Sequence, residues 1–281
     1  MTLGRKAWQA IEPLHGFIYF VPEAQERFAA LGLSAGAGYF ASRSAAFGAA
    51  SAETVIATFY NFNPSFVRHS MAGVWEKVAP EQVLTARLEA ADAALRRGLG
   101  DLIDTEALAE AAALTRTAAE AACERLEGRP LFAAHAALPW PTEPHLQLFH
   151  AQTLLREFRG DGHIAALLTA ELTGLEALVV HAATGYLPAK VLRNSRKWSE
   201  EQWAEAVAVL QERKILEPGE ELALTEEGRT MRQRVEDLTD RLAEPAYAAL
   251  GEAGTDRLAE VGKPLSDAVI EAGLLPYLKK K

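Results

Sequence analysis

Residues 212–238 read ERKILEPGEELALTEEGRTMRQRVEDL, and this stretch decides the fold class that we expect. A helix ends shortly before it in Leu210, and the short basic turn at Arg213 and Lys214 follows. Pro218 and Gly219 then mark a tight turn between two short apolar runs, which predicts a small β-hairpin. The segment LTEEGR at 224–229 opens a long helical pattern. The order is therefore helix, small hairpin, long helix.

Three helical pieces precede this hairpin, between residues 161 and 211. With them, residues 161–238 resemble the winged-helix domain of MarR-like regulators, and LTEEGR is the most specific part of the likeness. The resemblance implies that the helix before the hairpin enters the DNA major groove and that the wing contacts the backbone.

Three further motifs extend the likeness to the whole chain. They are ASRSAAFG at 41–48, FYNFNP at 59–64 and LREFRGDGH at 155–163, and together they resemble a winged-helix-like family of actinobacteria. This resemblance implies the fold and no particular activity.

Composition and helical periodicity place the chain among soluble, mainly helical proteins. It has 281 residues, of which 49% are hydrophobic and 24% charged. Residues 80–99 and 105–126 have helical spacing, and Pro64 should divide residues 51–75 into two helices. We therefore predict an all-α protein with minor β-hairpins.

The sequence also bears on location and metal binding. No run of about 18 apolar residues occurs, and the N-terminus lacks the apolar core of a signal peptide. We expect a cytoplasmic protein with no membrane partner. The single cysteine, Cys123, excludes an internal disulfide framework and a multi-cysteine metal site. We predict no metal site, and the sequence does not identify a cofactor.

The two halves of the chain share a faint repeat. Glu53, Pro64 and Trp75 recur, with small gaps, as Glu176, Pro188 and Trp198. The repeat predicts two tandem winged-helix-like halves packed together, although chance similarity of two alanine-rich stretches stays open. The expected domains are a degenerate N-terminal half at 1–128, a proline-rich connection at 129–144 and a C-terminal half with further helices at 145–281.

The charge distribution disfavours DNA as a partner. The formal net charge is −9. The helix that would read bases begins SEEQWAE at 199–205, with three carboxylates and no cation, and the wing carries Glu217, Glu220 and Glu221. A carboxylate beside a phosphate is repulsive and forfeits counterion release. A MarR-like DNA-binding transcriptional regulator therefore stays as a second alternative.

The pentapeptide RGDGH at 159–163 interrupts an apolar helical run. We expect Gly160 to end one helix and Asp161 to cap the next, which accounts for these residues without a ligand. The alternative is that the new helix N-terminus, with Arg156 and His163, binds a carboxylate or a phosphate.

We expect polar residues from both halves to converge on one pocket. Arg43 and Ser44 would approach from one side and Asp161 and His163 from the other, beside an aromatic wall. The favoured function is that of a regulator-like protein that binds a small anionic or aromatic molecule between its halves. The alternative is an enzyme with His163 as acid or base, although no catalytic motif is present. The expected ligand-binding residues are Arg43, Ser44, Tyr60, Asn61, Asn63, His150, Arg156, Asp161 and His163.

Overall fold

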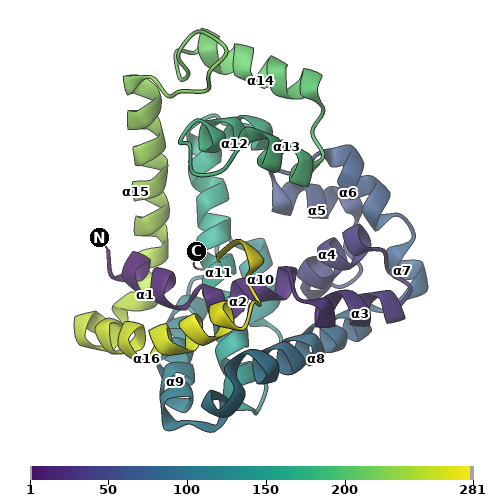
Figure 1. Cartoon of the computed structure of the whole chain (residues 1–281), viewed down its shortest axis with the longest axis vertical. Helices are drawn as coiled ribbons and strands as arrows, with labels where there is room; N and C mark the ends of the chain where they lie inside the picture. Colours follow the sequence, from purple (N-terminus) through teal and green to yellow (C-terminus); the bar gives the residue numbers. More distant parts are fainter. Residues whose placement is uncertain (1, 279–281) are drawn as a thin grey trace. The chain divides into compact units, whose positions relative to one another are not determined.

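The computed structural model describes residues 2–278, and this part of the chain is helical with no β-strand (Figure 1). The expected hairpin is reduced to one isolated antiparallel bridge between Leu216 and Leu224, within which Glu217 N donates to Ala223 O at 2.9 Å. The all-α class is confirmed. The β-hairpins that we expected are not formed as strands in residues 2–278.

The helices pack into two compact units that interleave along the sequence. Unit 1 comprises Met1–Ala50, Gly73–Asp161 and Asp240–Lys281, and unit 2 comprises Ser51–Ala72 and Gly162–Thr239. The proline-rich connection at 129–144 belongs to unit 1 and contains a helix of its own. These units describe packing, so the expected domains at 1–128 and 145–281 stay a prediction.

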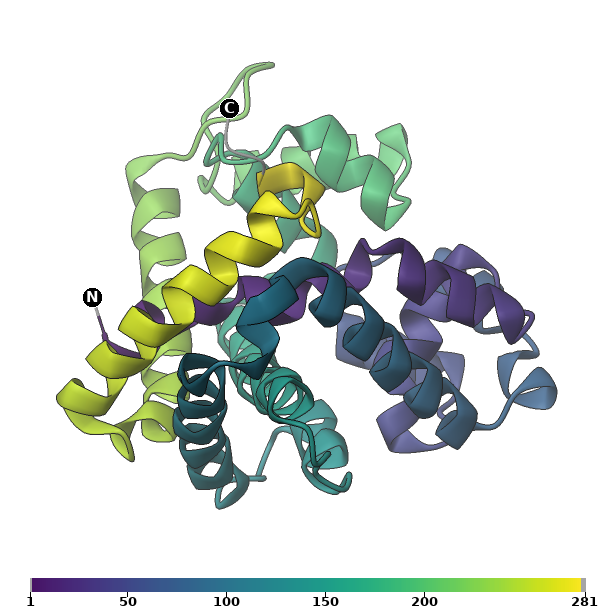
Figure 2. The ribbon, with the colours of Figure 1, turned by 60° about the horizontal axis from the view of Figure 1, so that its bottom comes forward.

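Unit 1 is a bundle in which α16 packs on α1, α8 and α9 (Figure 2). Pro80 occupies the first turn of α8, where its missing N–H costs nothing, and Thr105 caps α9. The helices of unit 1 are α1 (Leu3–Ile11), α2 (Pro13–Gly16), η1 (Phe17–Tyr19), α3 (Pro22–Ala30), α4 (Ala35–Ser44), η2 (Ala45–Phe47), α7 (Val74–Lys77), α8 (Pro80–Leu99), η3 (Gly100–Asp104), α9 (Glu106–Cys123), α10 (Pro130–Ala136), α16 (Gly251–Glu271) and η4 (Pro276–Leu278).

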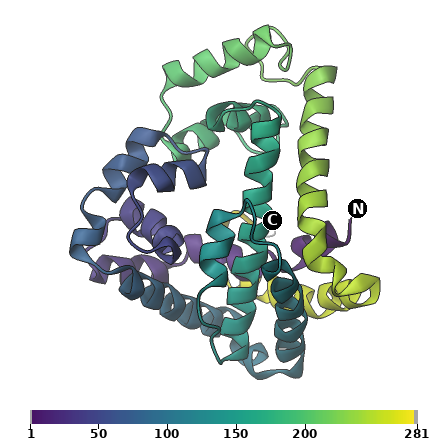
Figure 3. The same ribbon diagram turned by 180° about the vertical axis from the view of Figure 1, so that it is seen from behind.

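Unit 2 combines two helices from the first half of the chain with three helices of the stretch that resembles a winged-helix domain (Figure 3). They are α5 (Ala52–Phe59), α6 (Pro64–Met71), α12 (Gly174–Ala182), α13 (Ala189–Arg196) and α14 (Glu200–Glu212). Pro64 begins α6, so the expected division at this proline is confirmed. Thr173 caps α12 and Ser199 caps α14, each in a reciprocal capping box with the residue three positions later.

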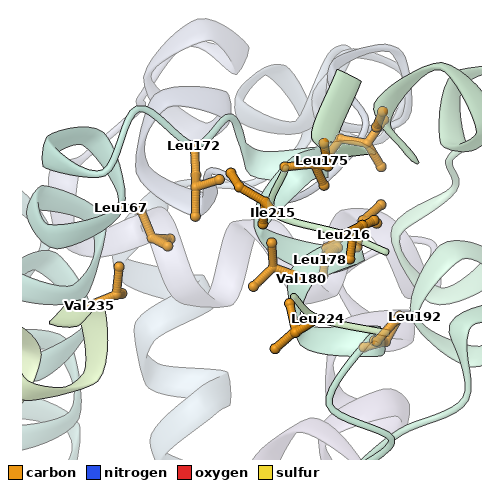
Figure 4. Close-up of a cluster of buried hydrophobic side chains, with 14 of the residues drawn as sticks. Leu167, Leu172, Leu175, Leu178, Val180, Leu192, Ile215, Leu216, Leu224 and Val235 are labelled. Atoms are coloured by element: carbon orange, nitrogen blue, oxygen red, sulfur yellow. The ribbon is translucent and has the colours of Figure 1, made fainter. Parts of the chain in front are cut away.

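The core of unit 2 forms around α12. Leu175, Leu178 and Val180 of this helix meet Ile215 and Leu216 from the stretch before the wing (Figure 4). Each of these side chains is less than one-tenth exposed. The apolar run that suggested a hairpin strand is therefore buried, although it pairs through a single bridge.

Two long helices contain residues of both units: α11 (Pro144–Thr169) and α15 (Glu226–Ala248). The continuity of α11 corrects our prediction for RGDGH, because the helix does not end at Gly160 and Asp161 does not begin a new one. A glycine inside a helix costs only about 1 kcal/mol relative to alanine, which the packing of a 26-residue helix absorbs.

Candidate functional site

The turn between α13 and α14 in unit 2 is held by a loop from the first half of the chain. Trp198 Nε1 donates to Asn61 O at 2.9 Å, and Asn63 N donates to Arg196 O at 3.0 Å. The side chain of Asn63 adds a bond from Nδ2 to Gln202 Oε1 at 3.1 Å. Backbone and side-chain bonds thus join the FYNFNP loop to the start of α14.

Tyr60 anchors the other end of this loop. Its hydroxyl donates to Leu172 O, and its backbone has a positive φ of 45°. Gly174 at the start of α12 approaches the loop so closely that a Cβ there would lie 1.9 Å from Tyr60 O. Only glycine allows this approach. The side-chain polar groups of Tyr60 and Asn63, which we expected to bind a ligand, are therefore engaged within the protein.

The outward face of α14 carries carboxylates and small apolar side chains. Glu201, Glu205 and Glu212 are exposed, and Val209 between them is 43% exposed. No Lys or Arg occurs anywhere in the sequence of α14. The nearby Arg193 forms an ion pair with Glu200 at 2.5 Å. The structure thus places the acidic residues of this helix at the surface.

A second polar group of side chains lies in unit 1, and we call it the arginine cluster. Arg43 on α4, Arg87 on α8 and Arg156 on α11 contribute three guanidinium groups. The side chain of Arg43 is 11% exposed and that of Arg156 is 31% exposed, whereas Arg87 is 4% exposed. The other members of the arginine cluster are Glu12, His15, Tyr19, Tyr39, His135 and Glu157.

Carboxylates and aromatic rings surround Arg43 and Arg156, which we call the outer arginines because they are more exposed than Arg87. Arg43 donates to Tyr39 Oη at 2.9 Å and reaches Glu157 Oε1 at 3.4 Å, while Arg156 donates to Glu12 Oε1 at 3.0 Å. Both guanidinium carbons lie 5.3 Å from the centroid of the Tyr19 ring, which is within cation–π range. The two cations therefore lie beside one aromatic ring.

The inner arginine fixes the protonation of a buried histidine. Arg87 donates to Ser42 O at 3.1 Å, and its second Nη lies 3.2 Å from His15 Nε2. Because a guanidinium has only donors, His15 Nε2 must accept and the ring proton must sit on Nδ1. That buried Nδ1 has no hydrogen-bond partner in the described structure. His15 therefore presents a donor that the protein does not use.

The histidines of the cluster are neutral at physiological pH. Burial, together with Arg156 and Arg87, holds the pKa of His15 well below its ordinary value. Burial and Arg87 lower the pKa of His135 to about 3. Burial alone would raise the pKa of Glu157, but Arg43 and Arg156 hold it below its ordinary value, so this carboxylate is ionised.

With this geometry in view, comparison with known proteins assigns the chain to a family. A model of a helix-turn-helix family matches residues 4–276. The chain belongs to this helix-turn-helix family. No curated protein matches this helix-turn-helix protein. No solved structure matches it either.

Of the residues expected to bind a ligand, the structure brings Arg43 and Arg156 together in unit 1 of this helix-turn-helix protein. Ser44 is completely buried and donates to Phe40 O of its own helix at 2.8 Å. His150 is 8% exposed and its ring packs edge-on against Trp140, with the centroids 4.7 Å apart. Burial, Arg87 and Arg116 lower the pKa of His150 to about 4.

Asp161 and His163 lie on α11 but make unrelated contacts. Asp161 accepts a hydrogen bond from Phe132 N at 3.0 Å and so caps the N-terminus of α10. His163 Nδ1 lies 2.9 Å from Thr239 Oγ1, and Thr239 donates to Val235 O. The cavity that we expect Arg43 to share with His163 would join residues of both units, and it stays a prediction.

Sequence reasoning missed the inner part of the arginine cluster. Arg87 lies on the buried face of α8, where Val83, Ala90 and Ala94 are completely buried. The helical spacing of these residues places Arg87 on that face, so periodicity is the one sequence feature that indicates its burial. His15, Tyr19 and His135 come from short segments with no such pattern, and their convergence depends on tertiary folding.

In residues 2–278, no group of three or more His, Cys, Asp or Glu side chains is placed to hold a metal ion. In the same residues no single helix is long and apolar enough to cross a membrane. Helices α11 and α12 pass that test only as a pair, by length and composition, and they are bent by 95° at their junction.

Proposed function

We propose that this chain is a regulator-like helix-turn-helix protein that binds a small anionic molecule in unit 1. The family membership supports the regulator-like part of the proposal. The arginine cluster supports the choice of ligand. The predicted pocket between the two halves is not needed for this proposal, because the cluster lies within one unit.

The observation that carries the proposal is a set of buried polar atoms with no protein partner. His15 Nδ1, His135 Nε2 and Arg156 Nε are all buried and unpartnered in the described structure. A buried polar atom without a partner costs about 1–3 kcal/mol, so native proteins rarely retain one. Several within one cluster are best explained by a bound molecule or by ordered water that completes their hydrogen bonds.

Reading of DNA bases by α14 is the less favoured function. Its outward face would bring Glu201, Glu205 and Glu212 toward phosphate and base edges that carry negative charge or acceptors. A winged-helix fold also serves as a ligand-binding or protein-interaction scaffold, since fold does not dictate function. We therefore place the ligand at the centre of the function.

Helix α11 physically connects the proposed ligand site in unit 1 with the helix-turn-helix segment in unit 2. Arg156 and Glu157 belong to unit 1, and the same uninterrupted helix continues through Gly162 into unit 2. A ligand that contacts Arg156 in one position of α11 more favourably than in another would shift the helix-turn-helix segment that follows. Continuity of the helix is what supports this step.

Two local features support the finer proposal of tandem winged-helix-like halves. Gln82 accepts from Ala79 N at the start of α8, and Gln202 accepts from Ser199 N at the start of α14. A tryptophan precedes each of these capped positions: Trp75 lies four residues before Ala79, and Trp198 lies directly before Ser199. A MarR-like order of α12, α13, α14, bridge and α15 likewise supports a winged helix in unit 2.

Native mass spectrometry of the freshly purified full chain tests the proposal. We expect a retained small molecule in the wild type that is released on denaturation, and its loss in Arg156→Gln. The matched control is Arg257→Gln, which removes an exposed arginine of unit 1 that pairs with Glu110. A ligand-free wild type, or equal retention by both variants, would contradict the proposal.

Two further assays test the alternative functions of an enzyme and of a DNA-binding regulator. Turnover of the retained molecule that disappears in His163→Ala, with the fold intact, would favour the enzyme. Salt-dependent and sequence-specific retention of duplex DNA would favour the DNA-binding regulator, and Lys190 and Lys197 are the exposed cations of the α13 region that such binding would use.

A further inference from the structure

We infer that the arginine cluster binds an anion with a single negative charge, held as a carboxylate between Arg43 and Arg156. This inference rests on the proposed function and narrows its ligand to one chemical class. It depends on the charges of the cluster, on the contacts of its two outer arginines, and on the buried donors that face no protein acceptor.

The charge balance of the cluster sets the charge of the ligand. Arg43, Arg87 and Arg156 carry three positive charges, and Glu12 and Glu157 carry two negative charges. The histidines add none, because burial and the neighbouring arginines keep them neutral. One positive charge is therefore left in a region where Glu157 is only 5% exposed. A monoanion neutralises it, whereas a dianion would leave a negative charge beside a buried carboxylate.

The contacts of the outer arginines indicate where the carboxylate sits. The distance of 3.4 Å from Arg43 to Glu157 is long for a charge-assisted hydrogen bond, which is usually 2.7–2.9 Å. Arg156 has a buried Nε without a partner, although its Nη1 bonds to Glu12. Arg43 and Arg156 interact electrostatically with each other and with Glu157, and both lie beside the Tyr19 ring, so we place the carboxylate between them.

Exposure indicates how the ligand enters. Arg156 and Glu12 have side chains that are 31% and 20% exposed, whereas His15 is 1% exposed and His135 is 2% exposed. The cluster therefore has an outer end that is partly exposed to solvent and an inner end that is buried. A carboxylate that enters beside Arg156 stays in contact with solvent at one end, and the buried donor His15 Nδ1 lies at the inner end of the cluster.

Isothermal titration calorimetry of the full chain with a matched set of four-carbon probes tests this inference. Butyrate carries one charge, succinate carries two, and butyramide has the same shape with no charge. We expect butyrate to bind at least tenfold more tightly than succinate and butyramide to give no heat. Inorganic phosphate at pH 8, where it is mainly a dianion, should bind at least tenfold more weakly than butyrate.

Variants locate the site. Arg43→Gln and Arg156→Gln should each weaken butyrate binding at least tenfold, and Arg257→Gln should leave it unchanged. If Arg43→Gln does not fold, Arg156→Gln keeps the test, because its side chain is partly exposed. Equal or tighter binding of succinate or phosphate overturns the inference, and so does the absence of heat from every probe. The proposed function is judged separately, by whether native mass spectrometry finds a retained molecule.

Discussion

The carboxylate of Asp161 accepts a hydrogen bond from the backbone N–H of Phe132, 3.0 Å away and 29 positions earlier in the chain. Phe132 lies in the first turn of α10, so Asp161 caps a helix other than its own. The side chain is only 6% exposed, and burial raises its pKa to about 6 despite this hydrogen bond.

Replacing Asp161 with Asn should remove a pH dependence of stability. A carboxyl group whose pKa is raised on folding stabilises the protein at low pH, and this contribution is lost as the pH rises through about 6. Asn keeps the acceptor without the charge. We expect the free energy of unfolding of Asp161→Asn, relative to wild type, to increase by about 2 kcal/mol between pH 4 and 7. Urea denaturation at several pH values measures it, and a constant difference would count against a raised pKa.

A pair of glycine variants tests the continuity of α11 and the close approach at α12. At Gly160, a Cβ would lie 3.5 Å from the Glu157 side chain, an ordinary contact, so Gly160→Ala should stabilise the protein by up to about 1 kcal/mol. At Gly174, the Cβ would collide with Tyr60 O, so Gly174→Ala should destabilise by about 2–3 kcal/mol. Thermal denaturation compares the two. Destabilisation by Gly160→Ala would restore the helix break at RGDGH.

These glycines show how far local sequence patterns reach. Pro64 and the helices at 80–99 and 105–126 are determined by propensity and periodicity, and the structure confirms them. RGDGH looks like a helix boundary for the same local reasons. The partner of Asp161 is α10, however, and a capping bond between distant segments leaves no pattern in the sequence around either residue.

The candidate site was predictable only in part, because local motifs show which residues are polar but not what those residues contact. Arg43 and Arg156 stand in conspicuous polar motifs, and the structure places both in the arginine cluster. Tyr60, Asn61 and Asn63 are equally conspicuous, yet the Tyr60 hydroxyl bonds to Leu172 O before α12, the Asn63 amide bonds to Gln202 of α14, and the Asn61 carbonyl accepts from Trp198. Residue type alone cannot distinguish an asparagine that holds a turn from one that binds a ligand.

The loop contact to α14 gives a prediction about Asn63. Its Oδ1 accepts from Ser65 N at 2.9 Å as the cap of α6, and its Nδ2 bonds to Gln202. Asn63→Ala should lower the free energy of unfolding by about 1–3 kcal/mol, because both contacts are lost. Asn63→Ser keeps a capping oxygen and should lose about half as much. Urea denaturation of both variants measures this, and equal stability of wild type and Asn63→Ala would show that the contacts contribute nothing.

The buried histidines predict a loss of stability in acid. The pKa of His150 is lowered to about 4, so its contribution is present above the ordinary value near 6.5 and is lost as the pH falls toward 4. Its Nε2 has no partner, and its ring packs on Trp140. His150→Phe should therefore preserve stability at pH 7 and reduce the fall in melting temperature between pH 6.5 and 4. An unchanged slope would place the acid sensitivity elsewhere.

The central claim, that the arginine cluster binds a singly charged anion, is tested most directly by a crystal structure of the full chain with butyrate. We expect density for a carboxylate within hydrogen-bond distance of both Arg43 and Arg156, with the Arg43 and Glu157 side chains still in place. A cluster that holds only water at saturating butyrate, with the anion bound elsewhere or nowhere, would contradict it.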